Sequence, residues 1–313
     1  MCLNICYCME LIITIVLLVV GIVLLTKSAD WLVDSSVDIA YHLKIAPIYV
    51  GLTVVAFGTS LPELVVSLFA AYRSSTEIIL GNVIGSNIAN IGLFIGIAAV
   101  IFPLALSKRT LQIDFPMMLG ISFLFFFLAL TGSFGLIKGI ILLAAFVAFL
   151  WYVFMSSKPT KSPHPQHTMV RNVAFVILGS IGLYFGGKLL VENAVLLARY
   201  FGMSELIIGL TIVAVGTSAP EIFVGISAAL RKHVGLIIGN VIGSNIFNIG
   251  WVFGVISLFW EIPVASLVLY DIAIMLVFSV VLYIFAFTSK VIARWEGVVL
   301  LVLYSAYIVY LFI

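Results

Sequence analysis

Long apolar runs separated by short polar stretches make up most of the chain. Because a helix needs about 20 apolar residues to cross the hydrocarbon core of a bilayer, each run predicts one membrane-spanning helix. The ten predicted spans cover residues 11–34, 47–72, 78–102, 113–131, 135–155, 170–198, 205–230, 236–259, 266–287 and 293–312. The longest polar stretch, from Ser156 to Gln166, contains three of the nine prolines, which oppose helix formation. The pattern therefore predicts two five-helix halves, residues 1–157 and 170–313, joined by a short linker at 158–169.

Composition supports a membrane protein. Hydrophobic residues make up 64% of the 313 residues and charged residues only 9%, whereas soluble domains contain about 45–50% and about 25%. This small number of charged residues cannot cover a water-facing surface. Together with the long apolar runs, it predicts an all-α polytopic membrane protein as the fold class. The net charge of +2 gives no reason to expect a nucleic-acid partner. The three cysteines all fall within the first eight residues, a stretch that we interpret as a tail or an upstream start, and they form no plausible disulfide framework or zinc site.

Positive charge predicts the orientation of the spans. With the N-terminus outside, the inside loops hold ten Lys and Arg residues and the outside loops hold three. Cytoplasmic loops are enriched in these residues, so the linker is expected to be cytoplasmic and both termini outside. A compact chain of this kind is expected in the cell (plasma) membrane of a prokaryote.

The chain contains an internal repeat. A shift of 158 residues aligns Gly51–Gly96 with Gly209–Gly254 without a gap, and 27 of the 46 positions are identical. The identities include polar runs, with GLTVVAFGTSLPE matching GLTIVAVGTSAPE and GNVIGSNIANIG matching GNVIGSNIFNIG. Since each half has an odd number of spans, the second copy enters the membrane in the opposite orientation. This predicts inverted-topology repeats, in which substrate sites lie near the midplane between the copies.

Two acidic residues lie deep inside predicted spans, at equivalent positions of the repeat. Glu63 falls in the second span and Glu221 in the seventh. An ionised carboxylate at the bilayer centre costs about 2.5–3.5 kcal/mol on insertion scales, and such residues are usually functional. Each follows a proline, Pro62 or Pro220, which removes a backbone hydrogen bond and breaks the helix. Broken membrane helices are tolerated where the freed backbone lines a polar cavity.

Further oxygen donors share a helical face with each glutamate. The first copy offers the hydroxyls of Thr59 and Ser60 and the backbone at Ala56, and the second offers Thr217, Ser218 and Ala214. The third and eighth spans each add a polar stripe at every fourth residue. The stripes are Asn82, Ser86 and Asn90, and Asn240, Ser244 and Asn248. Pairs of glycines on these spans allow close helix packing, which would bring the stripes against the glutamates, with Asn82 and Asn240 as helix contacts or outer support.

This donor set favours hard cations. Oxygen and amide ligands without His or Cys suit sodium, calcium or magnesium rather than zinc, copper or iron. Calcium accepts six to eight oxygens in flexible geometry, while magnesium demands a stricter octahedron. Two carboxylates balance one divalent or about two monovalent ions. A site that either ion can fill, but not both at once, is a physical basis for antiport. No cofactor is expected.

The paired motifs GTSLPE and GTSAPE, each followed by a GNVIGSNI stretch, resemble the two α-repeats of the sodium/calcium exchanger superfamily of cation/calcium antiporters. The resemblance covers essentially the whole chain and is closest to prokaryotic members, whose short loop leaves no room for a regulatory calcium-binding domain. It implies ten helices, with the first and sixth sliding against the other eight, and exchange of several sodium ions for one calcium. The ion ligands that it implies are Ala56, Thr59, Ser60, Glu63, Ser86, Asn90, Ala214, Thr217, Ser218, Glu221, Ser244 and Asn248.

One position departs from the family pattern. Many relatives carry Asp at the position of Asn248, whereas both copies here carry Asn. The site then has two formal negative charges, which weighs against potassium co-transport. A sodium/calcium antiporter that works by alternating access is the leading hypothesis, and a proton- or potassium-coupled calcium exchanger is the alternative.

Other classes fit less well. A passive channel more naturally uses closed rings of ligands, and a hydrolase needs an activated nucleophile that the predicted spans lack, so no enzyme is expected. Asp30, Asp34 and Asp38 share one face near the inner end of the first span. Two interpretations are open for them, a solvated face and a cation-attracting vestibule.

Overall fold

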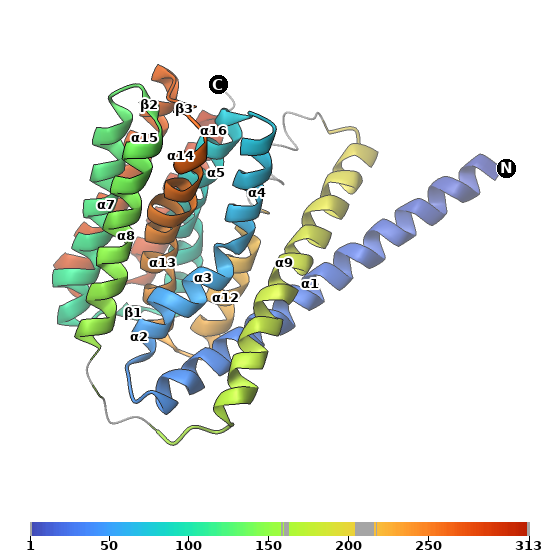
Figure 1. Cartoon of the computed structure of the whole chain (residues 1–313). Coiled ribbons are helices and arrows are strands. Elements are labelled where there is room, and N and C mark those ends of the chain that lie inside the picture. Colours follow the sequence, from blue (N-terminus) through green and yellow to red (C-terminus); the bar gives the residue numbers. More distant parts are fainter. Residues whose placement is uncertain (1, 158, 160–162, 204–215, 217, 312–313) are drawn as a thin grey trace.

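The structure is a computed structural model, which describes residues 2–157, 159, 163–203, 216 and 218–311 (Figure 1). The first half begins with one long helix, α1 (Cys2–His42). The following path is broken into shorter pieces: α2 (Pro47–Val50), a π-helical turn η1 (Gly51–Val55), α3 (Ala56–Thr59) and α4 (Leu61–Tyr72). The rest of this half consists of α5 (Thr76–Ala89), η2 (Asn90–Ile95), α6 (Gly96–Ile101), β1 (Leu104–Ala105), η3 (Thr110–Asp114), α7 (Phe115–Ala129), β2 (Ser133–Phe134) and α8 (Leu136–Ser156).

The second half follows the same order where it is described. It begins with α9 (Met169–Tyr200). Residues 205–215 and 217 of the predicted span at 205–230 lie outside the described residues, and the described part contains α12 (Ala219–Leu230). The remaining elements are α13 (Val234–Ile246), η5 (Phe247–Phe253), α14 (Gly254–Phe259), β3 (Ile262–Pro263), α15 (Ser266–Ser289), β4 (Val291–Ile292) and α16 (Arg294–Tyr310).

The described residues form an all-helical membrane protein. Seven helices are long and apolar enough to cross a bilayer, and the bent pair Pro47–Thr59 and Leu61–Tyr72 makes up to eight. The shorter α12 is also apolar, and α16 has 17 residues. The expected count of ten therefore stays a prediction. The first helix extends beyond the predicted span 11–34 at both ends. It begins at Cys2, and its polar end continues as regular helix to His42.

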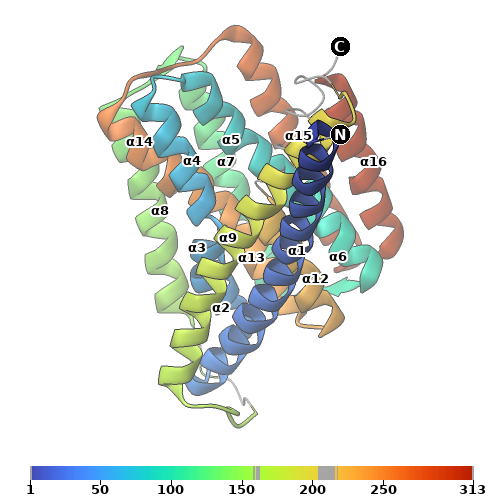
Figure 2. The ribbon, with the colours of Figure 1, turned by 90° about the vertical axis from the view of Figure 1, so that its right-hand side faces the viewer.

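Two long helices lie side by side against the bundle formed by the others. Figures 1 and 2 show α1 and α9 crossing this bundle together, with the start of α1 projecting from it. Glycines allow the two backbones to approach: a Cβ at Gly21 would lie 2.9 Å from the Leu190 nitrogen, and one at Gly186 would lie 2.9 Å from the Leu25 nitrogen. Small residues serve this purpose in membrane helix pairs.

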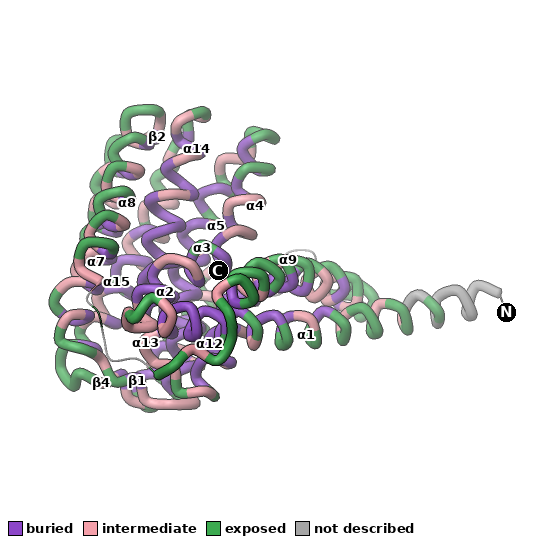
Figure 3. Tube along the Cα trace, turned by 60° about the horizontal axis from the view of Figure 1, so that its bottom comes forward, coloured by how far each residue is buried: buried purple, intermediate pink, exposed green. Residues whose placement is uncertain are grey.

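Buried residues gather around α5 and α13 in the middle of the bundle, while the projecting part of α1 is exposed (Figure 3). The exposed side chains include many large apolar ones, such as Ile12, Val16 and Val23 on α1. Apolar exposure of this extent fits contact with lipid, because hydrocarbon tails are as apolar as these side chains. A set of polar side chains, including Thr59, Glu63, Ser86 and Ser244, is instead buried.

Two short antiparallel strand pairs join the halves at opposite ends of the bundle (Figure 1). β1 pairs with β4, with Leu104 opposite Ile292, and β2 pairs with β3, with Phe134 opposite Ile262. The repeat shift of 158 residues places Leu104 on Ile262 and Phe134 on Ile292. The two pairs are therefore equivalent in register when the halves are exchanged.

Candidate ion-binding site

The helix break that the sequence predicts before Glu63 is present. α3 ends at Thr59, Ser60 adopts φ −84° and ψ 3°, and α4 begins at Leu61 with Pro62 in its first turn. The two pieces differ in direction by 41°. In the second half Ser218 adopts nearly the same angles, φ −89° and ψ 7°, immediately before α12. The Ser–x–Pro sequence thus ends one helical piece and begins another in the first copy, and it begins α12 in the second.

Both glutamates lie in the first turn of the helix after the break. The side chains are buried, with 0% exposure for Glu63 and 1% for Glu221. The two carboxyl groups are close enough to interact electrostatically. The free N–H groups and positive dipole end of a helix N-terminus favour negative charge at this position. The centre of the bundle therefore holds two neighbouring carboxyl groups, one from each half.

The polar stripe of α5 supports Glu63. Ser86 Oγ donates to Glu63 Oε1 at 3.3 Å, which confirms that the third span packs against the broken one. Asn82 Nδ2 donates to the Glu63 backbone carbonyl at 3.0 Å and to Ser67 Oγ at 2.8 Å. Asn82 is thereby committed to backbone and side-chain partners on α4, so it acts as outer support.

Thr59 connects the first break to the polar stripe of the second half. Its hydroxyl lies 3.2 Å from Asn240 Oδ1 and 3.3 Å from Ser244 Oγ. Glycines make this approach possible, because a Cβ at Gly239 would lie 2.4 Å from the Ile48 carbonyl oxygen and one at Gly243 would lie 2.7 Å from the Leu52 carbonyl oxygen. The predicted role of the glycines in close packing is confirmed for this pair.

Several buried oxygens around the carboxyl groups have no hydrogen-bond partner. Buried polar atoms are normally paired, and an unpaired one costs about 1–3 kcal/mol. Both Glu221 oxygens lack a hydrogen bond of standard geometry, although the Thr59 hydroxyl lies close by. The other unpaired side-chain oxygens of the described site are Ser60 Oγ, Glu63 Oε2, Asn90 Oδ1, Ser218 Oγ and Asn248 Oδ1. Unpaired buried acceptors of this kind are groups that a bound cation would satisfy.

The backbone ligand at Ala56 is in a different situation. The Ala56 carbonyl accepts the Ser60 N–H at 3.0 Å and lies 3.4 Å from the Thr59 hydroxyl. It is therefore already engaged within its own helical turn. Its predicted counterpart Ala214, together with Thr217, lies outside the described residues.

Two asparagines that the sequence analysis did not single out contact the same region. Asn87 Oδ1 accepts from Asn248 Nδ2 at 3.2 Å, and Asn87 Nδ2 lies 3.6 Å from the Met275 sulfur. Asn245, its equivalent in the second copy, lies 3.6 Å from the Met118 sulfur. Both belong to the repeated GNVIGSN run, so the repeat itself was the signal that could have found them. Next to them, Asn90 and Asn248 lie in the π-helical turns η2 and η5, a feature frequent at functional sites.

The three aspartates of α1 are paired with other elements. Arg231, at the end of α12, lies 2.8 Å from both Asp30 Oδ1 and Asp34 Oδ1. Asp38 accepts backbone hydrogen bonds from Gln166 at 2.7 Å and His167 at 2.9 Å, both within the linker. Asp34 is 59% exposed, as a solvated face predicts, whereas Asp38 is buried. The three groups also tie α1 to α12 and to the segment before α9.

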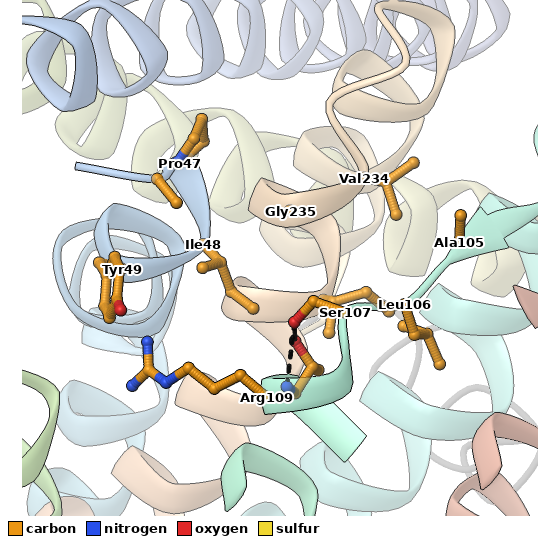
Figure 4. Close-up of a pocket in the computed structure, with 12 residues that line it drawn as sticks. Pro47, Ile48, Tyr49, Ala105, Leu106, Ser107, Arg109, Val234 and Gly235 are labelled. Atoms are coloured by element: carbon orange, nitrogen blue, oxygen red, sulfur yellow. Dashed lines mark hydrogen bonds between the residues drawn. The ribbon is translucent and has the colours of Figure 1, made fainter. Parts of the chain in front are cut away.

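A cavity of about 250 Å³ lies apart from the glutamates, at the linker end of the bundle (Figure 4). The start of α2, the turn after β1 and the start of α13 line it, and Ser107 Oγ accepts from the Thr110 N–H there at 3.1 Å. Arg109 reaches along it with the guanidinium 4.4 Å from the Tyr49 ring centroid. Its described lining includes Arg109 and no acidic residue, so it lacks the charge that a cation requires.

Comparisons with known proteins agree with this arrangement. A family model described as "Sodium/calcium exchanger protein" matches residues 13–155 and again residues 171–313. The sodium/calcium exchanger MaX1 of Methanosarcina acetivorans is 32% identical over 95% of this chain and 97% of its own length. The putative antiporter CaxA of Alkalimonas amylolytica is 38% identical over 77% of this chain and 79% of its own.

A solved structure has the same fold. The sodium-calcium exchanger NCX_Mj, soaked with zero Na⁺ and Ca²⁺, superposes with a TM-score of 0.86 at 35% identity and covers 96% of this chain and 99% of its own. The expectation of a membrane transporter rather than an enzyme is thus confirmed. Matches to both halves, to full-length relatives and to a solved structure lead to one conclusion: the chain belongs to the sodium/calcium exchanger protein family.

Proposed function

We propose that this protein is a secondary-active antiporter that exchanges sodium for calcium, with both ions competing for one site built on Glu63 and Glu221. The observation that carries the proposal is the pair of buried, neighbouring carboxyl groups, one from each half, surrounded by unpaired oxygens. The names of the relatives, which describe sodium/calcium exchange and antiport, support the same choice of ions.

The proposed ligands are the side chains of the site together with the helix breaks. In the first half they are Ala56, Thr59, Ser60, Glu63, Ser86 and Asn90, and in the second they are Ala214, Thr217, Ser218, Glu221, Ser244 and Asn248. Calcium, which takes six to eight oxygens in flexible geometry, suits a set of carboxylates, hydroxyls and amide oxygens of this size. Two carboxylates are neutralised by one calcium or by about two sodium ions, so either ion fills the site but not both.

The proposed architecture is ten spans in two inverted five-helix halves, residues 1–157 and 170–313. The family model matches the two halves with the same 158-residue offset that relates the repeated motifs. The exchange-equivalent strand pairs at opposite ends of the bundle also support it. With the linker at 158–169 cytoplasmic, both termini lie outside, as the loop charges favour, in a prokaryotic plasma membrane.

The mechanism that we propose for this arrangement is alternating access. α1 and α9 form the separate pair that would slide over the central helices. Moving an apolar helix face across an unpaired buried charge is costly, so the pair moves only when sodium or calcium neutralises the carboxylates. Exchange of three sodium ions for one calcium would move one net charge, which couples to the membrane potential at about 2.3 kcal/mol per 100 mV.

The test is radioactive calcium uptake by sodium-loaded proteoliposomes diluted into sodium-free buffer. The variants are Glu63→Gln and Glu221→Gln, with the exposed Glu261→Gln as the matched control. Uptake should require the outward sodium gradient, disappear in both site variants and persist in the control. Uptake driven by a pH or potassium gradient alone would refute sodium coupling. Flux that needs only the calcium gradient would indicate a channel.

A further inference from the structure

Asn248 contributes an oxygen to the proposed site only if its amide is turned the right way. The –NH₂ end of an asparagine is a donor that repels a cation, whereas the carbonyl end is a ligand. Asn248 is fully buried at the start of η5, one turn beyond Ser244, whose hydroxyl contacts Thr59. Its Oδ1 has no hydrogen-bond donor within the described part of the chain.

Asn87 fixes that orientation from the other half of the molecule. Asn248 Nδ2 donates to Asn87 Oδ1 at 3.2 Å, so the amino end of Asn248 is held toward α5 and its oxygen points the other way. This works only while Asn87 presents its own oxygen. If the Asn87 amide turned over, two –NH₂ groups would face each other.

Met275 of α15 determines which end Asn87 presents. Its thioether sulfur has no proton and can only accept a hydrogen bond. Asn87 Nδ2 lies 3.6 Å from this sulfur, so the amino group turns to Met275 and the oxygen is left for Asn248. Asn87 and Met275 are both buried, with 1% and 0% exposure, so water does not compete for these contacts.

The equivalent contacts in the other copy stop short of the site. Asn245 Nδ2 lies 3.6 Å from the Met118 sulfur, but Asn245 Oδ1 accepts no hydrogen bond, and both polar atoms of Asn90 are unpaired. The chain of contacts from methionine to ligand is therefore complete on the Asn248 side only. This difference supplies an internal control.

We propose that Asn87 is a positioning residue, anchored by Met275, that aims the carbonyl oxygen of Asn248 at the transported cation. The inference rests on the proposed function, since it assigns Asn248 as a ligand. Asn87 itself does not touch the ion. It acts by excluding the orientation in which Asn248 would present its amino group.

A double-mutant cycle tests this role, with calcium affinity of the purified full chain measured by calorimetry. Asn87→Leu removes the acceptor and lets the Asn248 amide turn over. Asn248→Asp carries an oxygen at both ends and needs no orientation. Asn87→Leu should therefore weaken calcium binding about tenfold with Asn248 present but less than about threefold in the Asn248→Asp background, a coupling within the range seen for contacting residues.

A second pair of variants avoids the risk that Asn87→Leu disturbs folding. Met275→Leu and Met118→Leu are volume-conserving changes that cores tolerate well. Met275→Leu should weaken calcium binding severalfold, while Met118→Leu should leave it unchanged. Equal losses from Asn87→Leu in both backgrounds, or equal effects of the two methionine variants, would overturn the positioning role. Wild-type protein that binds no calcium would instead overturn the proposed function itself.

Discussion

Gly239 lies where the second half packs closely against the helical pieces that lead to Glu63. Adding one methyl group there should therefore lower both the stability of the protein and its calcium uptake. A Cβ at Gly239 would lie 2.4 Å from the Ile48 carbonyl oxygen, 2.9 Å from the Leu52 nitrogen and 3.0 Å from the Gly51 Cα. All three are backbone atoms, which cannot turn aside as a flexible side chain can. Gly239→Ala must therefore push α13 away from α2 and η1.

Gly235 offers a matched control one turn earlier on α13. A Cβ at Gly235 would lie 3.4 Å from the Ile48 nitrogen and 3.7 Å from the Ile48 Cβ, which are ordinary contacts. Replacing Gly by Ala raises helix propensity by up to about 1 kcal/mol, and this gain largely cancels when the two variants are compared. Overpacking costs about 1–3 kcal/mol, and contacts with fixed backbone place Gly239→Ala toward the upper part of that range.

The two variants can be compared by thermal unfolding in detergent and by calcium uptake into proteoliposomes. Gly239→Ala should unfold several degrees below Gly235→Ala, and its uptake should fall because the Thr59 contacts with Asn240 and Ser244 open. Gly235→Ala should unfold at or slightly above the wild-type temperature, because it gains helix propensity without a clash, and its uptake should match the wild type. Equal stability and equal uptake of the two variants would refute the argument that this close approach builds the site.

Three further predictions concern groups outside the site. Arg109→Met should lower the free energy of unfolding by about 3 kcal/mol or more, because the buried Asp114, whose Oδ1 lies 3.6 Å from the guanidinium, loses its counterion. Adding Asp114→Asn to this variant should restore part of the lost stability, as measured by thermal unfolding. Asp38→Ala should speed protease cleavage between α8 and α9, because three hydrogen bonds to the carboxylate, two of them from backbone N–H groups of the linker, are lost. Burial, assisted by a nearby arginine and opposed by an aspartate, lowers the pKa of His233 from its ordinary value of 6.5. The folded protein then binds that proton less readily than the unfolded chain, so stability falls as pH drops below 6.5; His233→Gln should reduce this acid-side loss in melting curves recorded against pH.

Several parts of the site could be predicted from the sequence because the repeat marks them twice. The break before Glu63 follows from the local chemistry of Pro62, and the contact between Ser86 and Glu63 follows from helical spacing. Both are short-range features, and helix periodicity alone places their side chains on one face.

Other contacts depend on how distant elements pack, which spacing does not reveal. Arg231 pairs with Asp30 and Asp34 only because α1 crosses the end of α12. Asn87 faces away from the polar stripe defined by every fourth residue, so its contact with Asn248 emerges only when the two halves interlock. A pattern read along one helix could not distinguish these residues from general helix contacts.

The central claim is that sodium and calcium compete for one site on Glu63 and Glu221. Equilibrium calcium binding to the purified protein at increasing sodium concentration tests it most directly. We expect one calcium per chain, an apparent dissociation constant that rises with sodium without reaching a plateau, and loss of binding in Glu63→Gln and in Glu221→Gln. Calcium affinity that levels off or ignores sodium, or binding that survives in both variants, would contradict it.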